Sequence, residues 1–408
     1  MALRCPGCSQ MGHGTHAGAQ RSPWNPRARP RYAVTGTVVR GVGGTTYAAL
    51  VTKRRARRQH VLSKFYLRGF AEDGQLTRVP TDGGSPHAIS LNDATVVRDF
   101  YSVETDEGEL SDYFELAFAG VEQKAAPVLA AVLDGQWPLD CKSKEALATW
   151  IALQYLRTEA IRNSQTQIAA MLTRLVVGAS GKKALRVRIE RAEGNTISDA
   201  RLDAEWADLT KRGGPTVAPD VDAHIRTILE LTPPTAALLA HSQWSLDVFR
   251  RKVLLTSDHP VILVPEPGHP ANFGVGLANA GAYGLALSRS LGLVIMGPNY
   301  VLPDMRVPGS TALARALNAG AILNARKAVF HHPDDAHLLD GVTLRPRIEE
   351  IEMGGGDHFV QEQGFFAGVE PDAFDAIRSA EGGGEGMTLA DLEWPIPGRR
   401  FEWVEPSP

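Results

Sequence analysis

The sequence predicts an α+β fold, in which a mainly helical middle region is accompanied by short antiparallel strands and hairpins. Apolar residues keep helical spacing over residues 143–162, which predicts an amphipathic helix in the middle of the chain. Apolar and polar residues alternate over residues 244–248, which is typical of a half-buried strand. The chain has 408 residues, of which 43% are hydrophobic, and this is enough for a substantial core.

Composition and charge exclude several classes of protein. The formal net charge is -3 at pH 7, so no overall field attracts nucleic acid, and such contact would need a local patch. Three cysteines are too few for a disulfide framework and are typical of a reducing compartment. No apolar run approaches the ~20 residues that span a bilayer, and the N-terminus lacks a secretory signal pattern. We therefore expect a cytoplasmic protein with no membrane partner.

Composition also divides the chain into three parts. Residues 1–52 are rich in Gly, Arg, Pro and Thr without a sustained period, which predicts a disordered leader. Residues 53–345 are expected to form a single α+β domain, and residues 346–408 an irregular, acidic, Gly-rich extension. One hypothesis is that translation begins later, for example near Val51, which N-terminal sequencing of the native protein would test.

Four residues of metal-ligand types lie in the leader. Cys5 and Cys8 have the spacing of half a zinc knuckle, and His13 and His16 follow them. These four side chains could in principle close a tetrahedral site. Their spacing is too short for a standard zinc finger, so we favour a leader without zinc.

The first motif of the predicted domain is a Gln-His pair, Gln59 and His60, at the start of an apolar stretch that ends at Phe70. Helical spacing of the apolar residues predicts a short amphipathic helix there, and Gly69 weakens its last turn. A His in a first helical turn is kept neutral by the helix dipole, and a neutral imidazole can act as a base or a metal ligand. The alternative is that Gln59 and His60 cap the helix or bond to a neighbouring segment.

A dense basic run comes just before this motif and could contact phosphates. The alternative is a solvated flexible arm, because no aromatic residues alternate with the charges. If nucleic acid is a partner, we expect contact through Lys53, Arg54, Arg55, Arg57 and Arg58.

Strands are expected next at residues 76–79, 95–97 and 100–103, followed by a helix over about residues 111–133. Pro127 should kink or interrupt this helix. Its Glu115 and Glu122 lie seven residues apart on one side. Such a pair could hold a divalent cation or do acid–base work, or it could simply be a solvated surface.

The helix predicted over residues 143–162 carries Arg157 and Arg162 near its end, where cations suit the helix dipole. The same placement would suit the wall of an anion-binding pocket. Residues 185–240 are expected to be helical as well, with breaks at Gly213-Gly214-Pro215 and at Pro233-Pro234.

A β-hairpin is expected from a strand at residues 243–249 and a second at 253–255. Ser257 and Asp258 then lie at a strand end, and His259 follows. Asp258 could be a general base or a metal ligand that pairs with His259. The alternative is an Asx or Ser turn, in which these side chains bond the local backbone.

Two further strands are expected at residues 283–287 and 291–296, then a helix over 311–327 and a short strand at 329–330. Ligand-type residues follow at 331–335, but adjacent His side chains diverge on an extended chain, which disfavours a metal site. Nucleotide-binding loops, hydrolase elbows and zinc-protease helices are missing from the sequence.

Several short motifs along the chain together form a recognisable pattern. They are Gln59-His60, Phe65-Tyr66-Leu67, Phe70, Phe100-Tyr101, Glu122, Pro127, Arg157-Thr158, Thr256-Ser257-Asp258-His259-Pro260-Val261, Leu287-Ser288, Asn324 and Arg326. With them, residues 57–332 resemble the bacterial family called domain of unknown function (DUF) 4238. Members often carry Pro where this chain has Ala286. The resemblance implies a fold and a set of site residues, and it brings no activity with it.

Folding would have to bring the separated polar residues into one cleft for them to act together. In that case His60 or Asp258 would activate water and Arg157 would stabilise developing negative charge, as phosphodiester hydrolysis requires. The substrate-binding residues would then be Gln59, Ser257, Arg162 and Arg326.

The first functional hypothesis is therefore a nuclease-like hydrolase, in a defence or toxin role, for which a divalent metal could be a cofactor. One alternative is an enzyme that acts on a small anionic substrate. Another is a binding or interaction protein, in which these residues form a buried hydrogen-bond network.

Overall fold

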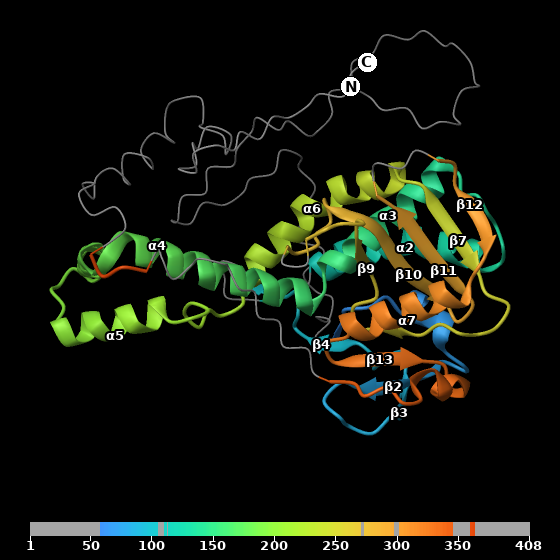
Figure 1. Ribbon diagram of the computed structural model, residues 1–408, viewed down its shortest axis with the longest axis horizontal. Helices are drawn as coiled ribbons and strands as arrows, with labels where there is room; N and C mark the ends of the chain where they lie inside the picture. The colour runs from blue at the N-terminus through green and yellow to red at the C-terminus, as the bar shows by residue number, and fades with distance from the viewer. Residues whose placement is uncertain are drawn as a thin grey trace, which may run out of the picture. The chain divides into compact units, whose positions relative to one another are not determined.

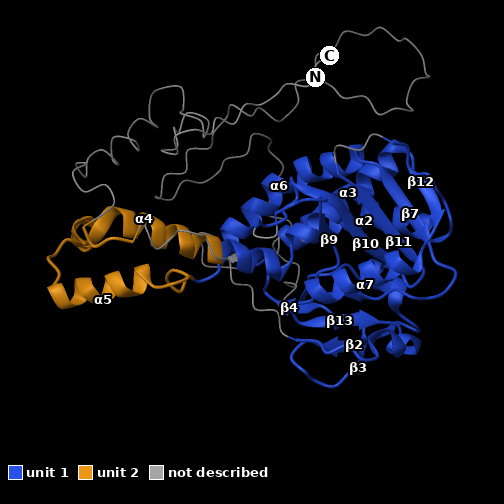
Figure 2. Ribbon diagram, viewed as in Figure 1, with its two compact units in different colours: residues 1–166, 218–350 blue, residues 167–217, 351–408 orange. Residues whose placement is uncertain are grey.

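The computed structural model describes residues 58–104, 110–111, 113–270, 273–297, 302–345 and 360–363 (Figure 1). The predicted leader lies outside these residues, as do Lys53, Arg54, Arg55 and Arg57 of the basic run and nearly all of the predicted extension. The chain divides into two compact units, residues 1–166 with 218–350 and residues 167–217 with 351–408 (Figure 2). Helices and small, mainly antiparallel sheets make up the described residues, which confirms the α+β class.

The larger sheet that the described residues form lies in the first unit and has the order β12-β7-β11-β10-β9. Neighbours are antiparallel except β12, which is parallel to β7. The strands are β7 (Trp244–Val248), β9 (Ile262–Pro265), β10 (Ala280–Ser288), β11 (Leu291–Met296) and β12 (Met305–Pro308). β10 and β11 are almost wholly buried, which explains their nearly continuous apolar sequences. The two strands predicted at 283–287 and 291–296 are confirmed.

A second sheet of the first unit has the antiparallel order β3-β2-β13-β8. Its strands are β2 (Gln75–Pro80), β3 (His87–Ser90), β8 (Thr256–Ser257) and β13 (Ala328–His331). β13 is buried along its whole length and pairs with β2 on one side, as Figure 1 shows, and with β8 on the other. The sheet therefore carries Asp258, just after β8, toward residues near the start and the end of the domain.

The predicted hairpin of residues 243–249 with 253–255 is wrong in its second strand. β7 forms as expected, but it pairs with β11 and β12. Residues 253–255 run as a loop whose backbone is bonded elsewhere: Val253 N and Leu254 N both donate to the Arg289 carbonyl oxygen, at 2.8 and 3.0 Å. The side chain of Asn318 also bonds this loop, donating to Val253 O (2.8 Å) and accepting from Leu255 N (3.1 Å). Because Arg289 and Asn318 already bond the backbone N–H and C=O groups of this buried segment, it needs no neighbouring strand.

The predicted helix at the Gln-His motif is shorter than expected and begins later. Gln59 and His60 belong to β1 (Arg58–His60), which pairs with β4 (Val96–Arg98). The helix α1 (Lys64–Leu67) follows Ser63, and a 3-10 turn, η2 (Arg68–Phe70), continues it. Gly69 is required there for close approach, because a Cβ at this position would stand 2.6 Å from the Leu287 carbonyl oxygen.

Three helices form the helical half of the first unit: α2 (Tyr113–Leu133), α3 (Cys141–Leu156) and α6 (Val221–His241). A ribbon of β5 (Val103–Glu104) and β6 (Leu110–Ser111) precedes α2. α3 packs against both α2 and α6 and contributes fully buried Trp150 to the main core. α2 continues without interruption through Pro127. α6 continues through Pro233 and Pro234, so the break predicted at that pair is wrong, because tertiary packing can override the cost of proline within a helix. The break predicted at Gly213-Gly214-Pro215 is confirmed, because these residues precede α6 and lie outside any helix.

The last helix of the first unit, α7 (Thr311–Asn324), is capped by the Ser310 side chain, which accepts from Leu313 N at 3.1 Å. α7 contacts β8 of the smaller sheet as well as β9 and β10 of the larger one (Figure 1). It thereby ties the two sheets together. A 3-10 segment, η3 (Pro333–Leu339), follows β13.

The second unit is a helical hairpin of the later part of α4 (Glu159–Glu193) and α5 (Asp199–Thr210). Its core consists of Val177, Leu185, Ile197, Leu202 and Trp206, with Val360 packed against it. Gly181, at φ 82° and ψ 165°, interrupts α4. Residues 360–363 bond the backbone around this interruption, through Gln361 N to Gly178 O (3.3 Å) and Lys182 N to Glu362 O (2.9 Å).

Candidate functional site

Arg157 lies at the end of α3 inside a buried polar network. Its side chain is only 2% exposed. Its Nη2 lies 2.8 Å from Glu122 Oε1, 2.9 Å from Ser63 Oγ and 2.9 Å from Gln154 Oε1. Ser63 Oγ also accepts from the Trp150 indole N–H at 2.8 Å and donates to Glu122 at 2.7 Å. The network joins α1, α2 and α3, so these residues are placed to hold three elements together.

Gln59 and Arg162 also have structural partners. The Gln59 side chain is fully buried; its oxygen accepts from Tyr101 N at 2.5 Å and its nitrogen donates to Ser102 Oγ at 3.3 Å. Arg162 donates to the Phe100 carbonyl oxygen at 2.5 Å, and its guanidinium lies 3.6 Å from the Phe100 ring centroid. Both side chains therefore fasten the segment around residues 100–102 to the helices.

His60 is partly exposed on β1. Its Nε2 lies 3.1 Å from the Asn92 carbonyl oxygen, which makes that nitrogen the donor. Burial lowers the pKa of His60, and the positive charge of Lys64 lowers it further. The neutral form is favoured, as the sequence suggested, but the cause is burial and a nearby cation, because His60 precedes the helix and gains nothing from its dipole.

Ser257 ends β8, and Asp258 begins the turn that follows it. The Asp258 carboxylate accepts from two backbone amides, Arg326 N at 2.9 Å and Lys327 N at 2.8 Å, so it fixes the connection between α7 and β13. Ser257 Oγ bonds the local backbone at His259, donating to its carbonyl at 3.1 Å and accepting from its amide at 3.3 Å. Burial raises the pKa of Asp258, and the two amide bonds partly oppose that rise.

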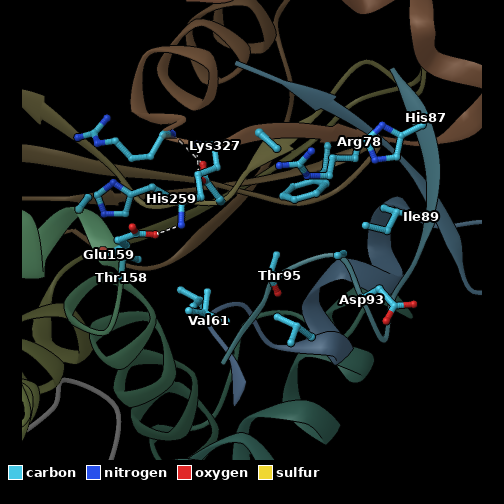
Figure 3. Close-up of a pocket in the computed structure, with 18 residues that line it drawn as sticks. Val61, Arg78, His87, Ile89, Asp93, Thr95, Thr158, Glu159, His259 and Lys327 are labelled. Carbon is cyan, nitrogen blue, oxygen red and sulfur yellow. Dashed lines mark hydrogen bonds and ion pairs between the residues drawn. The ribbon is translucent and has the colours of Figure 1, made fainter. Parts of the chain in front are cut away.

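A pocket of about 320 Å³ opens in the first unit beside Asp258 (Figure 3). Of the residues proposed from the sequence, Asp258 and Arg326 line it, and His259 does so as well. The pocket lining does not include His60, Arg157, Gln59, Ser257 or Arg162. The structure therefore brings Asp258 and Arg326 together and does not place His60 and Arg157 in a cleft with them.

The pocket has two polar ends. At one end the Lys327 ammonium lies 2.5 Å from the Glu159 carboxylate, beside Thr158 and His259 (Figure 3). At the other end lie Arg78 and His87 (Figure 3). The two polar ends come from distant parts of the sequence: Arg78 and His87 lie on β2 and β3, whereas Lys327 lies between α7 and β13. No local sequence pattern therefore marks the pocket.

Arg78 and His87 are direct partners across the β2–β3 pair, so their side chains lie on one face of the sheet. The His87 Nδ1 lies 3.1 Å from the Ser85 carbonyl oxygen, which leaves Nε2 free to face a ligand. Within the described part of the chain, no hydrogen bond or ion pair engages the Arg78 guanidinium. Sequence reasoning missed both residues, and the only available signal was an Arg and a His at facing positions of two short strands.

One cluster of metal-ligand types is present on the described surface, at Glu72, His332 and Asp334, whose ligand atoms lie within 4.8 Å of one another. The chemistry opposes a cation there. The Nδ1 of buried His332 already accepts from Asp334 N at 3.2 Å. The Arg289 guanidinium also lies 3.8 Å from the Asp334 carboxylate. These residues fit a cap on η3 better than a metal centre.

Among the described residues, no helix combines the length and the low polarity that crossing a membrane would require. No curated protein and no solved structure gives a significant match to the chain. The family described as "Protein of unknown function (DUF4238)" matches residues 58–335, which include both sheets and the pocket. Because the match covers well over half of the sequence, the chain belongs to the DUF4238 family.

Proposed function

We propose that this protein binds a small anionic molecule in the pocket beside Asp258, with Arg78 as its principal contact. The observation that carries the proposal is the unmatched charge of Arg78. The other end of the pocket carries an internal ion pair, Lys327 with Glu159, whereas no described residue neutralises Arg78. An arginine in a hollow of the surface without a protein partner is suited to hold a carboxylate or phosphate.

His87 supports the same proposal because it faces Arg78 across the sheet. A planar guanidinium can donate two parallel N–H bonds to one anion, and an imidazole beside it adds a third contact. Arg326 also lines the pocket, and its side chain donates to the Asn324 carbonyl oxygen at 2.8 Å. Its place beside Asp258 makes it a secondary contact in this proposal.

Inorganic phosphate is the simplest probe of the proposal. Isothermal titration calorimetry on the full chain should show binding that Arg78→Gln weakens at least about tenfold, because the charge-assisted bonds are lost. Arg68→Gln is the matched control: Arg68 is exposed on η2 and does not line the pocket. Equal phosphate binding by the wild type and both variants would overturn the proposal.

Phosphodiester hydrolysis is the second candidate function, and one observation favours it. Asp258 lies in the pocket, and burial raises the pKa of its carboxyl, which is the direction that a general acid requires. In this proposed hydrolysis Asp258 transfers the proton and Arg78 holds the phosphate. His60 and Arg157 would only stabilise the fold. The basic run before residue 58 would guide nucleic acid to the domain.

Labelled RNA and DNA, incubated with and without a divalent metal, test this second candidate. Cleavage that Asp258→Asn abolishes and His60→Ala leaves intact would support hydrolysis in the pocket. Absence of cleavage of either nucleic acid under all conditions would remove it.

A further inference from the structure

Apart from its two polar ends, the pocket lining is mainly apolar, and it also includes Thr95 and Asp93, whose carboxylate pairs with Arg58. Val61 and Ala94, each 7% exposed, line it, as do Ala328 and Phe330, each 1% exposed. Val61 and Ile89 both point side chains toward the pocket space in Figure 3, below Arg78 and His87. Burial of this much apolar surface beside a single unmatched cation is the arrangement of a site for a ligand that has an apolar body.

The end of the pocket away from Arg78 has its charges matched within the protein. Glu159 and Lys327 pair with each other, and the Asp258 carboxylate accepts two backbone N–H bonds. A second charged group on a ligand would have to compete with the Glu159–Lys327 pair. A neutral apolar or hydroxyl-bearing group would leave that pair intact.

From these two observations we infer that the ligand is an amphipathic molecule with a single anionic group: a phosphate or carboxylate head at Arg78 and His87, joined to an apolar body of about the size of one ring. The inference rests on the proposed function and adds the ligand class. The volume agrees, because a cavity of about 150 Å³ holds benzene and this pocket has about 320 Å³ for a ring and its head group.

A ligand series separates the two proposals. Inorganic phosphate and phenyl phosphate are titrated into the full chain by calorimetry, with acetate and benzoate as the carboxylate pair. Phenyl phosphate should bind at least about tenfold more tightly than phosphate, because the ring leaves water for the apolar walls. The tighter of the two pairs identifies whether the head is phosphate or carboxylate.

Variants test whether the extra affinity for phenyl phosphate comes from the apolar walls of the pocket. Val61→Thr keeps the side-chain volume but makes that wall polar, and it should reduce the preference for phenyl phosphate over phosphate severalfold. Val128→Thr is the matched control, since Val128 is a partly buried valine of α2 outside the pocket. 4-Carboxyphenyl phosphate should bind less tightly than phenyl phosphate, and Glu159→Gln, which frees Lys327, should reverse that order.

The outcomes are distinguishable. If phosphate binds in an Arg78-dependent way but the ring adds nothing, the amphipathic ligand class is wrong and the anion site stands. If neither the phosphates nor the carboxylates bind, the anion site itself is wrong. A gain from the ring that Val128→Thr removes as fully as Val61→Thr also overturns the inference, because the apolar body would then lie elsewhere.

Discussion

Replacing Arg157 tests whether the buried polar network is structural or catalytic. The side chain is 2% exposed and its Nη2 contacts oxygens of Glu122, Ser63 and Gln154 at 2.8 to 2.9 Å. In Arg157→Ala the Glu122 carboxylate loses the cation that pairs with it among the described residues, and the stem of the arginine leaves a cavity in the core. We expect the full chain to remain foldable but markedly less stable.

The magnitude follows from the burial of the two partners. Breaking a buried ion pair by removing one partner costs about 3–5 kcal/mol. Glu122 is 28% exposed and can regain some water, which favours the lower part of that range. The free energy of unfolding should therefore fall by about 3 kcal/mol. Arg157→Lys keeps the charge but loses the planar fork, and it should cost about 1–2 kcal/mol.

Urea unfolding of the wild type and the two variants, followed by far-UV circular dichroism, measures these losses. Arg68→Ala is the control: this exposed arginine should change stability by less than about 0.5 kcal/mol. A loss below about 1 kcal/mol in Arg157→Ala would refute the structural interpretation and return Arg157 to the list of functional candidates.

Three further predictions concern close packing, pH and helix capping. Gly69→Ala should cost about 1–3 kcal/mol because its Cβ would stand 2.6 Å from a carbonyl oxygen of β10, whereas Gly120→Ala, in open space on α2, should stabilise by about 0.5–1 kcal/mol; equal effects in urea unfolding would contradict this. Burial and Arg162 lower the pKa of His224 to about 3, so the unfolded chain takes up a proton near pH 6.5 that the folded chain does not. Stability should thus fall by roughly 3 kcal/mol more between pH 7 and pH 4 in the wild type than in His224→Gln, and parallel pH profiles would exclude this role. Asp220→Ala should cost about 1 kcal/mol, measured in the same way, because the side chain caps α6 by accepting a backbone N–H bond at 2.9 Å; no loss would show that solvent replaces the cap.

The sequence predicted a helix or strand correctly where the buried face of that element alone produces a recognisable apolar pattern. The helices α2 and α7, and the strands β10 and β11, bury apolar faces and were predicted close to their observed bounds. The helix predicted over residues 143–162 instead ends at Leu156, and Arg162 belongs to α4. Residues 253–255 were predicted wrongly because a buried loop and a buried strand share the same apolar composition. The early start predicted for the first helix failed because Val61 and Leu62, which continue the helical apolar spacing, lie outside the helix, between β1 and α1. The pairing of β1 with β4, which holds Gln59 and His60 in a strand, is a long-range contact that the local sequence does not show.

The candidate site was predictable only in part, for a physical reason. Asp258 and Arg326 were proposed from the sequence, and both line the pocket. Arg157 was proposed as an anion holder, but from sequence an arginine at a helix end looks the same whether it faces a cleft or a carboxylate such as Glu122. Arg78 and His87 owe their position to the pairing of two strands, and such long-range register leaves no mark in the local sequence.

The central position of β13 bears on how the protein is made. The ribosome synthesises β2 about 250 residues before β13, and β13 is the strand that lies between β2 and β8 in the sheet. Until then the inner edge of β2 stays without its partner, so the smaller sheet and the pocket beside it can be completed only after most of the chain has been synthesised. A nascent chain stalled before residue 328 would therefore carry all the described α-helices and an incomplete pocket.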